Sequence, residues 1–281
     1  MSKWRPTEKD CVYVVPDVHG NVSLLKKICD RILPLRKSDG VKDKLILLGD
    51  LIDRHTDSHL VIDFCIELEK KYGSQVAFLM GNHELMLLQA LNIQPGKSMT
   101  LQGMTSTYKM WMENGGYDTI AGYMKRKGLE ESWGSLPRSR VIDIIPKEHI
   151  EFFMKSLVKY YEIGDFLFVH GGVNPLEPAS TQELEVLVWD RSLAKFVLNA
   201  IQFGGPLPWE KTVICGHNVM SSMMPIVKNN YMMLDCGSPK QLLVVELNSR
   251  QAYMSYPNKD RLVKFELKET TKVPGIFHRV Q

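Results

Sequence analysis

Short apolar runs alternate with longer amphipathic segments through the first ninety residues of the chain. The apolar runs Val12–Val15, Leu45–Leu48 and Val76–Met80 have the length that is typical of buried strands. Helices are expected from about Val22 to Leu33 and from about Ser58 to Tyr72. The segments between the strands are long enough for helical crossovers that join parallel strands. The pattern therefore predicts a β-α-β order for this part of the chain.

A long interval without a strand-like run follows Met80 and lasts until the apolar run Phe166–Val169. We interpret residues from about 92 to 160 as a helical insertion, whose role as a lid, a docking surface or simple packing stays open. Trp111 and Trp133 in it could line a substrate groove, although core packing suits such large apolar side chains better. The predicted helices of the insertion are Thr105–Glu113, Tyr117–Lys127 and Lys147–Tyr160.

The last third of the chain contains further strand-like runs that are separated by turn residues. These runs are Thr212–Cys215, Tyr231–Leu234, Leu242–Leu247 and Leu262–Phe265. Those after Cys215 suit antiparallel strands that close a second sheet. The chain is thus predicted to be an α/β protein with mixed sheets and helices. We expect one domain over residues 11–267, followed by a C-terminal tail over residues 268–281.

Composition and charge narrow the class of protein. With 281 residues and 44% hydrophobic content the chain can build a large core, and its net charge of +3 does not indicate a nucleic-acid-binding surface. The charged segment Met1–Asp10 lacks the apolar core of a signal peptide, and no uncharged apolar run could span a membrane. The five cysteines are scattered without Cys-x-x-Cys spacing, which indicates reduced thiols. A cytoplasmic protein with no membrane partner is expected.

Five apolar runs each end at a short polar motif. The motifs are Pro16-Asp17-Val18-His19-Gly20-Asn21, Gly49-Asp50-Leu51-Ile52-Asp53-Arg54, Gly81-Asn82-His83-Glu84, His170-Gly171-Gly172 and Gly216-His217-Asn218. Each motif alone has an ordinary explanation as a loop, a turn or a helix cap. Their occurrence together indicates that polar side chains collect at the carboxyl ends of strands in one sheet, where such proteins usually place their chemistry.

The side chains in these motifs form a nearly complete set of ligands for two metal ions. Asp17 and His19 are two residues apart, so they share a face and can bind one ion together. Asp50 could bridge that ion to a second one. The predicted ligands are Asp17, His19, Asp50, Asn82, His170 and His217. This mixture of oxygen and imidazole donors suits manganese, iron or zinc, and we expect two manganese ions.

Two ions about 3.5 to 4 Å apart can activate a shared water for attack on phosphorus, so no protein nucleophile is required. The remaining requirements are cations for the phosphate oxygens and a proton donor for the leaving oxygen. Arg54 can bind two phosphate oxygens, and His83 can donate the proton with Asp53 orienting its ring. The motifs therefore predict a phosphoester hydrolase.

The motifs resemble the phosphoprotein phosphatase branch of the calcineurin-like metallophosphoesterases, above all its bacterial and phage members, from about Cys11 to Leu247. Three further segments share in the resemblance: Glu113-Asn114-Gly115-Gly116, Val188-Trp189-Asp190-Arg191 and Leu234-Asp235-Cys236-Gly237. The resemblance implies a central β-sandwich of mixed sheets flanked by helices. It also implies the same six metal ligands, a catalytic group formed by His83, Asp53, Arg54 and Arg191, and phosphate binding by Arg54, Asn82, His83 and Arg191.

Three positions depart from the family pattern. Pro16 stands where Gly usually precedes the first Asp, and its ring fixes φ and removes a backbone donor. His55 stands where Gly usually follows the arginine, and Asn218 stands where Thr often follows the last histidine. None of the three removes a ligand, so we expect effects on fine geometry and substrate preference.

The predicted activity is hydrolysis of phosphoserine and phosphothreonine in a phosphoprotein or phosphopeptide. The main alternative is a symmetrical dinucleoside polyphosphate hydrolase acting on diadenosine tetraphosphate, with the same fold and metals and a nucleotide substrate. That subfamily typically lacks the acid at Asp53 and tends to have Asp at Glu84, so these residues favour the protein phosphatase. The remaining alternative is a non-catalytic phospho-binding module, against which the complete ligand set argues.

Overall fold

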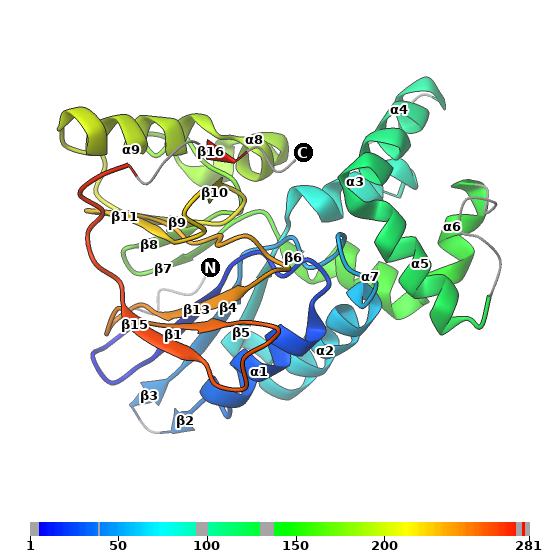
Figure 1. The fold of residues 1–281 in the computed structure, drawn as a ribbon, viewed down its shortest axis with the longest axis horizontal. Coiled ribbons are helices and arrows are strands. Elements are labelled where there is room, and N and C mark those ends of the chain that lie inside the picture. The colour runs from blue at the N-terminus through cyan, green and yellow to red at the C-terminus, as the bar shows by residue number, and fades with distance from the viewer. Residues whose placement is uncertain (1–5, 39, 94–100, 130–137, 274–276, 279–281) are drawn as a thin grey trace.

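The computed structural model describes residues 6–38, 40–93, 101–129, 138–273 and 277–278. Two stacked sheets form the centre, with helices α8 (Leu184–Trp189) and α9 (Ser192–Phe203) on one side and α1 (Val22–Ile32) and α2 (Ser58–Tyr72) on the other (Figure 1). This is the α/β fold with mixed sheets and flanking helices that the sequence predicts. Within the described ranges, no helix is both long enough and apolar enough to cross a membrane.

The first sheet has seven strands, of which the central ones are joined by the predicted helices. Its strand order is β15 (Val263–Glu266), β14 (Gln251–Ser255), β13 (Leu242–Glu246), β1 (Val12–Val15), β4 (Lys44–Leu47), β5 (Val76–Leu79), β6 (Leu157–Val158). Strands β1, β4, β5 and β6 run parallel, which confirms the predicted β-α-β order. A short hairpin of β2 (Lys37–Ser38) and β3 (Val41–Lys42) lies between α1 and β4.

The assignment of the late strands to a second sheet is wrong for two of the predicted runs. Strand β13 pairs antiparallel with β1, with Tyr13 opposite Glu246, and β14 and β15 follow it, so all three extend the first sheet. Strand β1 has β4 on one side only, and its other edge is satisfied by β13. Periodicity along a strand identifies its buried faces but carries no information about which edge it pairs with.

The second sheet has five strands. Its order is β11 (Ile226–Lys228), β12 (Tyr231–Met233), β9 (Thr212–Cys215), β8 (Phe166–Phe168), β7 (Tyr161–Ile163). The C-terminal segment adds a short strand β16 (Phe277–His278), which pairs with β10 (Val219–Met220) just after the last predicted ligand.

Alternation along the strands divides the core into layers. In β4 and the residue after it, Leu45 and Leu47 pack toward the helices while Ile46 and Leu48 pack toward the second sheet. Phe168 and Ile214 of the second sheet belong to the same inter-sheet cluster as Ile46. Side chains in a strand alternate between faces, so fully apolar runs are required where both faces are covered.

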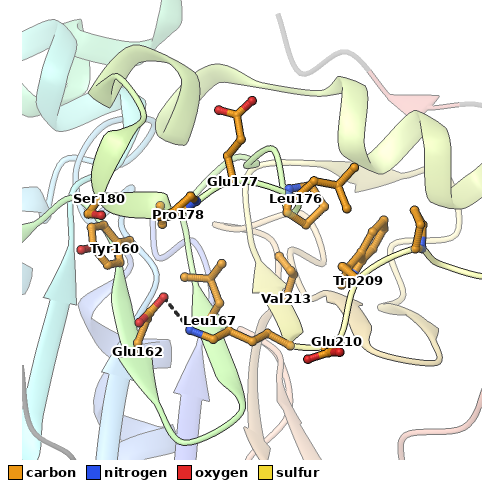
Figure 2. A pocket seen from close by; sticks show the side chains of 14 residues that line it. Tyr160, Glu162, Leu167, Leu176, Glu177, Pro178, Ser180, Trp209, Glu210 and Val213 are labelled. Carbon is orange, nitrogen blue, oxygen red and sulfur yellow. Dashed lines mark ion pairs between the residues drawn. The ribbon is translucent and has the colours of Figure 1, made fainter.

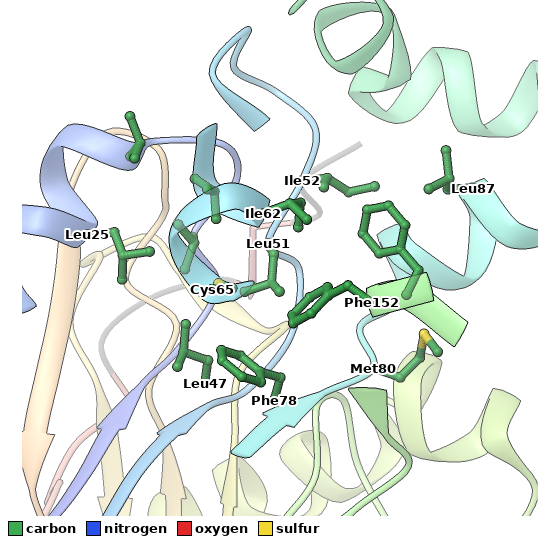
Figure 3. Close-up of a cluster of buried hydrophobic side chains, with 14 of the residues drawn as sticks. Leu25, Leu47, Leu51, Ile52, Ile62, Cys65, Phe78, Met80, Leu87 and Phe152 are labelled. Atoms are coloured by element: carbon green, nitrogen blue, oxygen red, sulfur yellow. The ribbon is translucent and has the colours of Figure 1, made fainter. Parts of the chain in front are cut away.

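The layer between the first sheet and the helices is packed by large side chains. Figure 3 shows Leu47 and Phe78 of the strands beside Ile62 and Cys65 of α2, with Phe152 completing the cluster. All five are 3% exposed or less, so this layer fixes the strand ends from which the site loops emerge.

The described part of the predicted insertion is mainly helical, and residues 94–100 and 130–137, which include Trp133, lie outside the described part. Helix α3 (Asn82–Ala90) precedes the insertion, whose described helical elements are α4 (Leu101–Trp111), a wider π-type turn η2 (Met112–Gly116), α5 (Tyr117–Arg126), α6 (Arg138–Ile144) and α7 (Lys147–Lys155). The helix predicted up to Tyr160 ends at Lys155, because the chain turns into β6 at the edge of the first sheet. In Figure 1 these helices lie together beside the two sheets.

Candidate active site

The five motifs lie together at one edge of the two stacked sheets, where strands of both sheets end. Asp17, Asp50 and Asn82 follow strands β1, β4 and β5 of the first sheet, whereas His170 and His217 lie beyond β8 and β9 of the second. The expectation that all ligands follow strands of one sheet is therefore wrong. The sandwich brings the carboxyl ends of parallel strands from both sheets to the same edge, so ligands from either sheet can meet.

One group of donors is formed by the first two motifs. His19 Nε2 lies 4.0 Å from Asp17 Oδ2 and 3.7 Å from Asp50 Oδ2, and all three side chains are buried. His19 Nδ1 lies 3.0 Å from the Ile52 carbonyl, to which it must donate. Nε2 then carries a lone pair, and it has no hydrogen-bond partner among the described residues. A buried imidazole with an unused lone pair between two carboxylates fits a divalent cation.

A second group of donors forms around the other side of Asp50. His170 Nδ1 donates to the Leu48 carbonyl at 2.8 Å, so Nε2 of the neutral ring is an acceptor. This atom faces Asn82 Oδ1 at 3.0 Å and Asp50 Oδ1 at 3.3 Å, and both are also acceptors. The Nε2 atom of His217 is buried without a partner among the described residues. A cation among these atoms would satisfy all of them.

Asp50 is common to both groups, as the sequence predicts for a bridging ligand. Donor atoms of His19, Asp50 and His83 lie within 4.8 Å of one another, and so do those of Asp50, His170 and His217. The structure thus brings all six predicted ligands together and adds His83 to the first group. The donor set fits two divalent cations, because it combines carboxylate, amide and imidazole donors at neighbouring positions and leaves two buried imidazole nitrogens without a partner among the described residues.

Neighbouring charges and burial shift the pKa values of the site residues in opposite directions. Burial alone would raise the pKa of Asp50, but the nearby rings of His170 and His83 hold it well below its ordinary value. Burial likewise opposes the charged form of His170, yet the Asp50 carboxylate raises its pKa to about 9, so Nε2 carries a proton whenever no cation takes that place. Burial, together with the Asp235 carboxylate, raises the pKa of Asp17 well above its ordinary value. Three buried carboxyl groups, those of Asp17, Asp50 and Asp235, are thus close enough to shift one another's pKa values.

The environment of His19 and His217 favours their neutral forms. Burial holds the pKa of His19 well below its ordinary value, and the charge of Arg54 adds to this effect. Burial lowers the pKa of His217 in the same way, with the charged His170 ring adding to it. The neutral form is the one that binds metal ions.

Arg54, His83 and Asp53 form a chain of contacts next to the donor groups. His83 Nδ1 lies 2.7 Å from Asp53 Oδ2, and Arg54 Nη2 lies 3.1 Å from His83 Nε2. A guanidinium group only donates, so Nε2 accepts from Arg54 and Nδ1–H donates to Asp53. The predicted pairing of Asp53 with His83 is therefore present in the structure.

The second arginine is held by one of the departures from the family pattern. Arg191 Nη1 donates to Asn218 Oδ1 at 2.8 Å, and the Asn218 amide in turn donates to the Gly171 carbonyl at 3.4 Å. Asn218 is fully buried. Asn218 therefore fixes the guanidinium beside the site. His55 instead lies at the rim, 37% exposed, with Asp57 as its neighbour.

Backbone conformation distinguishes the site from the rest of the chain. Five predicted site residues have positive φ: His19 at 47°, Asp50 at 48°, Asp53 at 72°, Arg54 at 64° and His217 at 62°. Such conformations cost about 1 to 3 kcal/mol per non-glycine residue and persist only where the surroundings enforce them. The loops are therefore held by contacts from elsewhere in the fold.

Glu84 supplies one of these contacts, and sequence reasoning used it only to distinguish subfamilies. Its buried carboxylate accepts from the backbone N–H groups of Gly81, Asp50, Leu51 and Ile52 at 2.7 to 3.2 Å. Burial and the Asp50 charge raise the pKa of Glu84 to about 7. The signal in the sequence is its place three residues after Gly81, as in a capping box. The sequence also does not predict that Trp111 and Thr119 of the insertion contact Asp53, because only the fold brings them to the site.

A separate hollow of about 720 Å³ lies away from these residues and contains none of the predicted ligands (Figure 2). Leu167, Leu176 and Trp209 contribute its apolar part, and Glu162 pairs with Lys211 at 2.9 Å within it. The hollow therefore does not take part in the chemistry of the donor groups.

The sequence profile described as Calcineurin-like phosphoesterase matches residues 12–221. This range covers most of the chain and contains all six predicted metal ligands. Among solved structures, a protein serine/threonine phosphatase from Saccharomyces cerevisiae superposes with a TM-score of 0.51 over 94% of this chain and 82% of that chain, at 14% identity. At this identity the likeness concerns the fold.

Curated relatives include proteins named bis(5'-nucleosyl)-tetraphosphatase, symmetrical. The one from Nitrosospira multiformis is 25% identical over 280 aligned residues, which cover 87% of this chain and 95% of the relative. The one from Actinobacillus succinogenes is 38% identical over 76 residues, which cover 27% of this chain and 25% of the relative. The chain therefore matches the second relative over only a quarter of that protein's length.

Proposed function

The chain belongs to the calcineurin-like phosphoesterase family of dinuclear metal-dependent phosphoric ester hydrolases, and from this premise we propose that it hydrolyses a dinucleoside polyphosphate such as diadenosine tetraphosphate. The observation that carries this proposal is the nearly full-length match to the Nitrosospira multiformis protein, whose name states this activity. The motifs alone place protein dephosphorylation first, and the comparisons support the nucleotide substrate better.

In this proposal the site would hold two divalent cations, with manganese as the first choice. Asp17, His19 and Asp50 would hold one cation, while Asp50, Asn82, His170 and His217 would hold the other. When bound, the cations supply an activated water and neutralise charge on the phosphate. The unused lone pairs of His19 and His217 support this assignment.

The other side chains bind and protonate the substrate. Arg54 and Arg191 bind phosphate oxygens, and the Asn218 contact keeps Arg191 turned toward the site. When Arg54 turns from His83 Nε2 to a phosphate oxygen, that nitrogen can carry a proton. His83 then donates it to the leaving oxygen while Nδ1–H stays on Asp53.

A second candidate function is dephosphorylation of phosphoserine and phosphothreonine in proteins. The observation in its favour is the 2.7 Å contact between His83 and Asp53. An aliphatic alkoxide is a poor leaving group and needs such a proton donor more than a nucleotide does. A non-catalytic phospho-binding module is the weakest candidate, because phosphate recognition alone does not require six converging metal ligands.

The test compares turnover of diadenosine tetraphosphate and of a phosphothreonine peptide by manganese-loaded protein, as a ratio of kcat/KM values. We expect the dinucleotide to be preferred and to give two molecules of ADP, which is the product of symmetrical cleavage. A strong preference for the peptide would overturn the nucleotide proposal and favour the protein phosphatase. Metal-loaded, folded protein without turnover of either compound would favour the binding module.

A further inference from the structure

The helical insertion reaches the catalytic group through two buried donors. Trp111 Nε1 lies 2.9 Å from Asp53 Oδ2 and 3.1 Å from Oδ1, and Thr119 Oγ1 lies 2.6 Å from Oδ1. We propose that Trp111 and Thr119 are positioning residues that fix Asp53 and, through it, align His83 as the proton donor. This inference rests on the acid role of His83 in the proposed function.

The donors account for both oxygens of the Asp53 carboxylate. Oδ2 receives His83 Nδ1–H and the Trp111 indole, while Oδ1 receives the Thr119 hydroxyl and lies near the same indole. Asp53, Trp111 and Thr119 are all 0% exposed, so water does not replace a missing donor. A buried carboxylate without such partners is strongly disfavoured. Each donor therefore restricts where the carboxylate can lie relative to His83.

Thr119 holds the backbone of Asp53 as well as its side chain. The Asp53 N–H donates to Thr119 Oγ1 at 3.0 Å and to Ser58 Oγ at 3.0 Å. Asp53 has a φ of 72°, a conformation that needs such support in a non-glycine residue. The Thr119 hydroxyl thus contacts both the backbone N–H and the carboxylate of Asp53, the residue that orients His83.

The turn between the two donors holds the next residue of the same loop. The Gly115 carbonyl accepts from the Arg54 N–H at 3.3 Å, within the π-type turn that joins α4 to α5. Gly115 has a φ of 109°, and a Cβ there would lie 2.8 Å from Arg54 N. The turn requires glycine at this point for two independent reasons. The insertion therefore makes hydrogen bonds to two consecutive residues of the site loop, Asp53 and Arg54. This role goes beyond simple packing.

The test uses variants that remove one donor and keep an apolar side chain of the same class in its place. Trp111→Phe removes the indole N–H, Thr119→Val removes the hydroxyl, and Thr119→Ser keeps it. Turnover is compared on para-nitrophenyl phosphate and phenyl phosphate, which differ in leaving group but little in size. We expect Trp111→Phe and Thr119→Val to lower the rate of phenyl phosphate hydrolysis about tenfold and that of para-nitrophenyl phosphate less than about twofold. Thr119→Ser is expected to restore the ratio of the two rates to that of the unsubstituted protein.

Tyr123→Phe is the matched control for loss of a buried donor in the same insertion. Tyr123 is 0% exposed on α5, and its hydroxyl contacts His149 at 2.8 Å rather than Asp53. We expect this variant to lower the melting temperature without changing the ratio of the two substrates. A changed ratio in Tyr123→Phe would mean that any loosening of the insertion has the same effect, and would overturn the specific role.

Combining these substitutions with His83→Asn distinguishes the acid role of His83 from the positioning role of Trp111 and Thr119. If Trp111 acts through His83, then Trp111→Phe has no further effect on the substrate ratio in a His83→Asn background. Should His83→Asn itself leave the ratio unchanged, the acid role in the proposed function is wrong. Should His83→Asn change the ratio while Trp111→Phe and Thr119→Val do not, the acid role stands and the positioning role is wrong.

Discussion

At the scale of single residues, the site depends on side chains that serve two partners at once. Asp50 lies within 3.7 Å of both His19 and His83 and within 3.3 Å of His170. Its backbone N–H is held by Glu84, so the loop is fixed at the same point. A change at such a residue affects both donor groups together.

Asp50→Asn is expected to lower turnover by well over about 100-fold, because one amide cannot replace a carboxylate shared by two cations. Metal content and kcat of the purified variant check this. Asp57→Asn is the matched control, since Asp57 is 38% exposed and next to His55 at the rim. Normal metal content and rate in Asp50→Asn would contradict the bridging role.

Glu84→Gln is expected to destabilise the fold by about 2 to 4 kcal/mol, because an amide group would face N–H donors of the Asp50 loop. Urea unfolding measures the loss of stability. The unfolding slope is expected to stay constant, since the surface exposed on unfolding is unchanged. An effect below about 0.5 kcal/mol would show that the loop does not depend on this carboxylate.

At the scale of elements, a partly buried polar network joins α2 to two helices of the insertion. Asp63 on α2 accepts from His149 Nε2 at 2.9 Å and from Arg126, while His149 Nδ1 contacts the Tyr123 hydroxyl. His149 is 0% exposed. The network therefore fixes the insertion against α2, close to the segment that contacts Asp53.

Burial alone would raise the pKa of Asp63, but hydrogen bonds from Arg126 and His149 outweigh it and lower the pKa. A lowered folded-state pKa contributes stability that is present above the unfolded value of about 3.9 and is lost as pH falls through the folded value. Asp63→Asn is thus expected to cost about 1 to 2 kcal/mol at neutral pH, and less below about pH 4.

Thermal unfolding of the Asp63 variant across this pH range checks the prediction. Asp143→Asn serves as control, because Asp143 also pairs with an arginine but is 55% exposed. A difference from the unsubstituted protein that stays constant between pH 3 and pH 7 would contradict the assignment to Asp63.

At the scale of the whole molecule, the two sheets meet where the donors collect, so a cation that joins them should stabilise the fold. Manganese at about 100 times its dissociation constant is expected to add about 2.7 kcal/mol of stability per site. The melting temperature with manganese and with a chelator measures this. His217→Ala should reduce the increase, because it removes a second-sheet donor, and an unchanged increase would place the metal elsewhere.

Much of the fold follows from the sequence because its signals are local. Strands β1 and β9 and helix α2 have the predicted boundaries, since apolar runs and helix-compatible segments end at polar or turn residues. The runs that form β13 and β15 were assigned to the wrong sheet, because pairing depends on edges that are distant in sequence. Contacts within the candidate site that join residues distant in sequence could not be predicted for the same reason.

The sequence by itself determined which side chains are available for the chemistry and that each follows a strand, because both are properties of short segments. Only the tertiary structure decided that the predicted ligands come from two sheets and that Glu84, Trp111, Thr119 and Asn218 contact the loops and side chains of the candidate site. Trp111 and Asp53 are 58 residues apart in sequence. Contacts of this kind arise from packing of distant elements, for which local periodicity carries no signal.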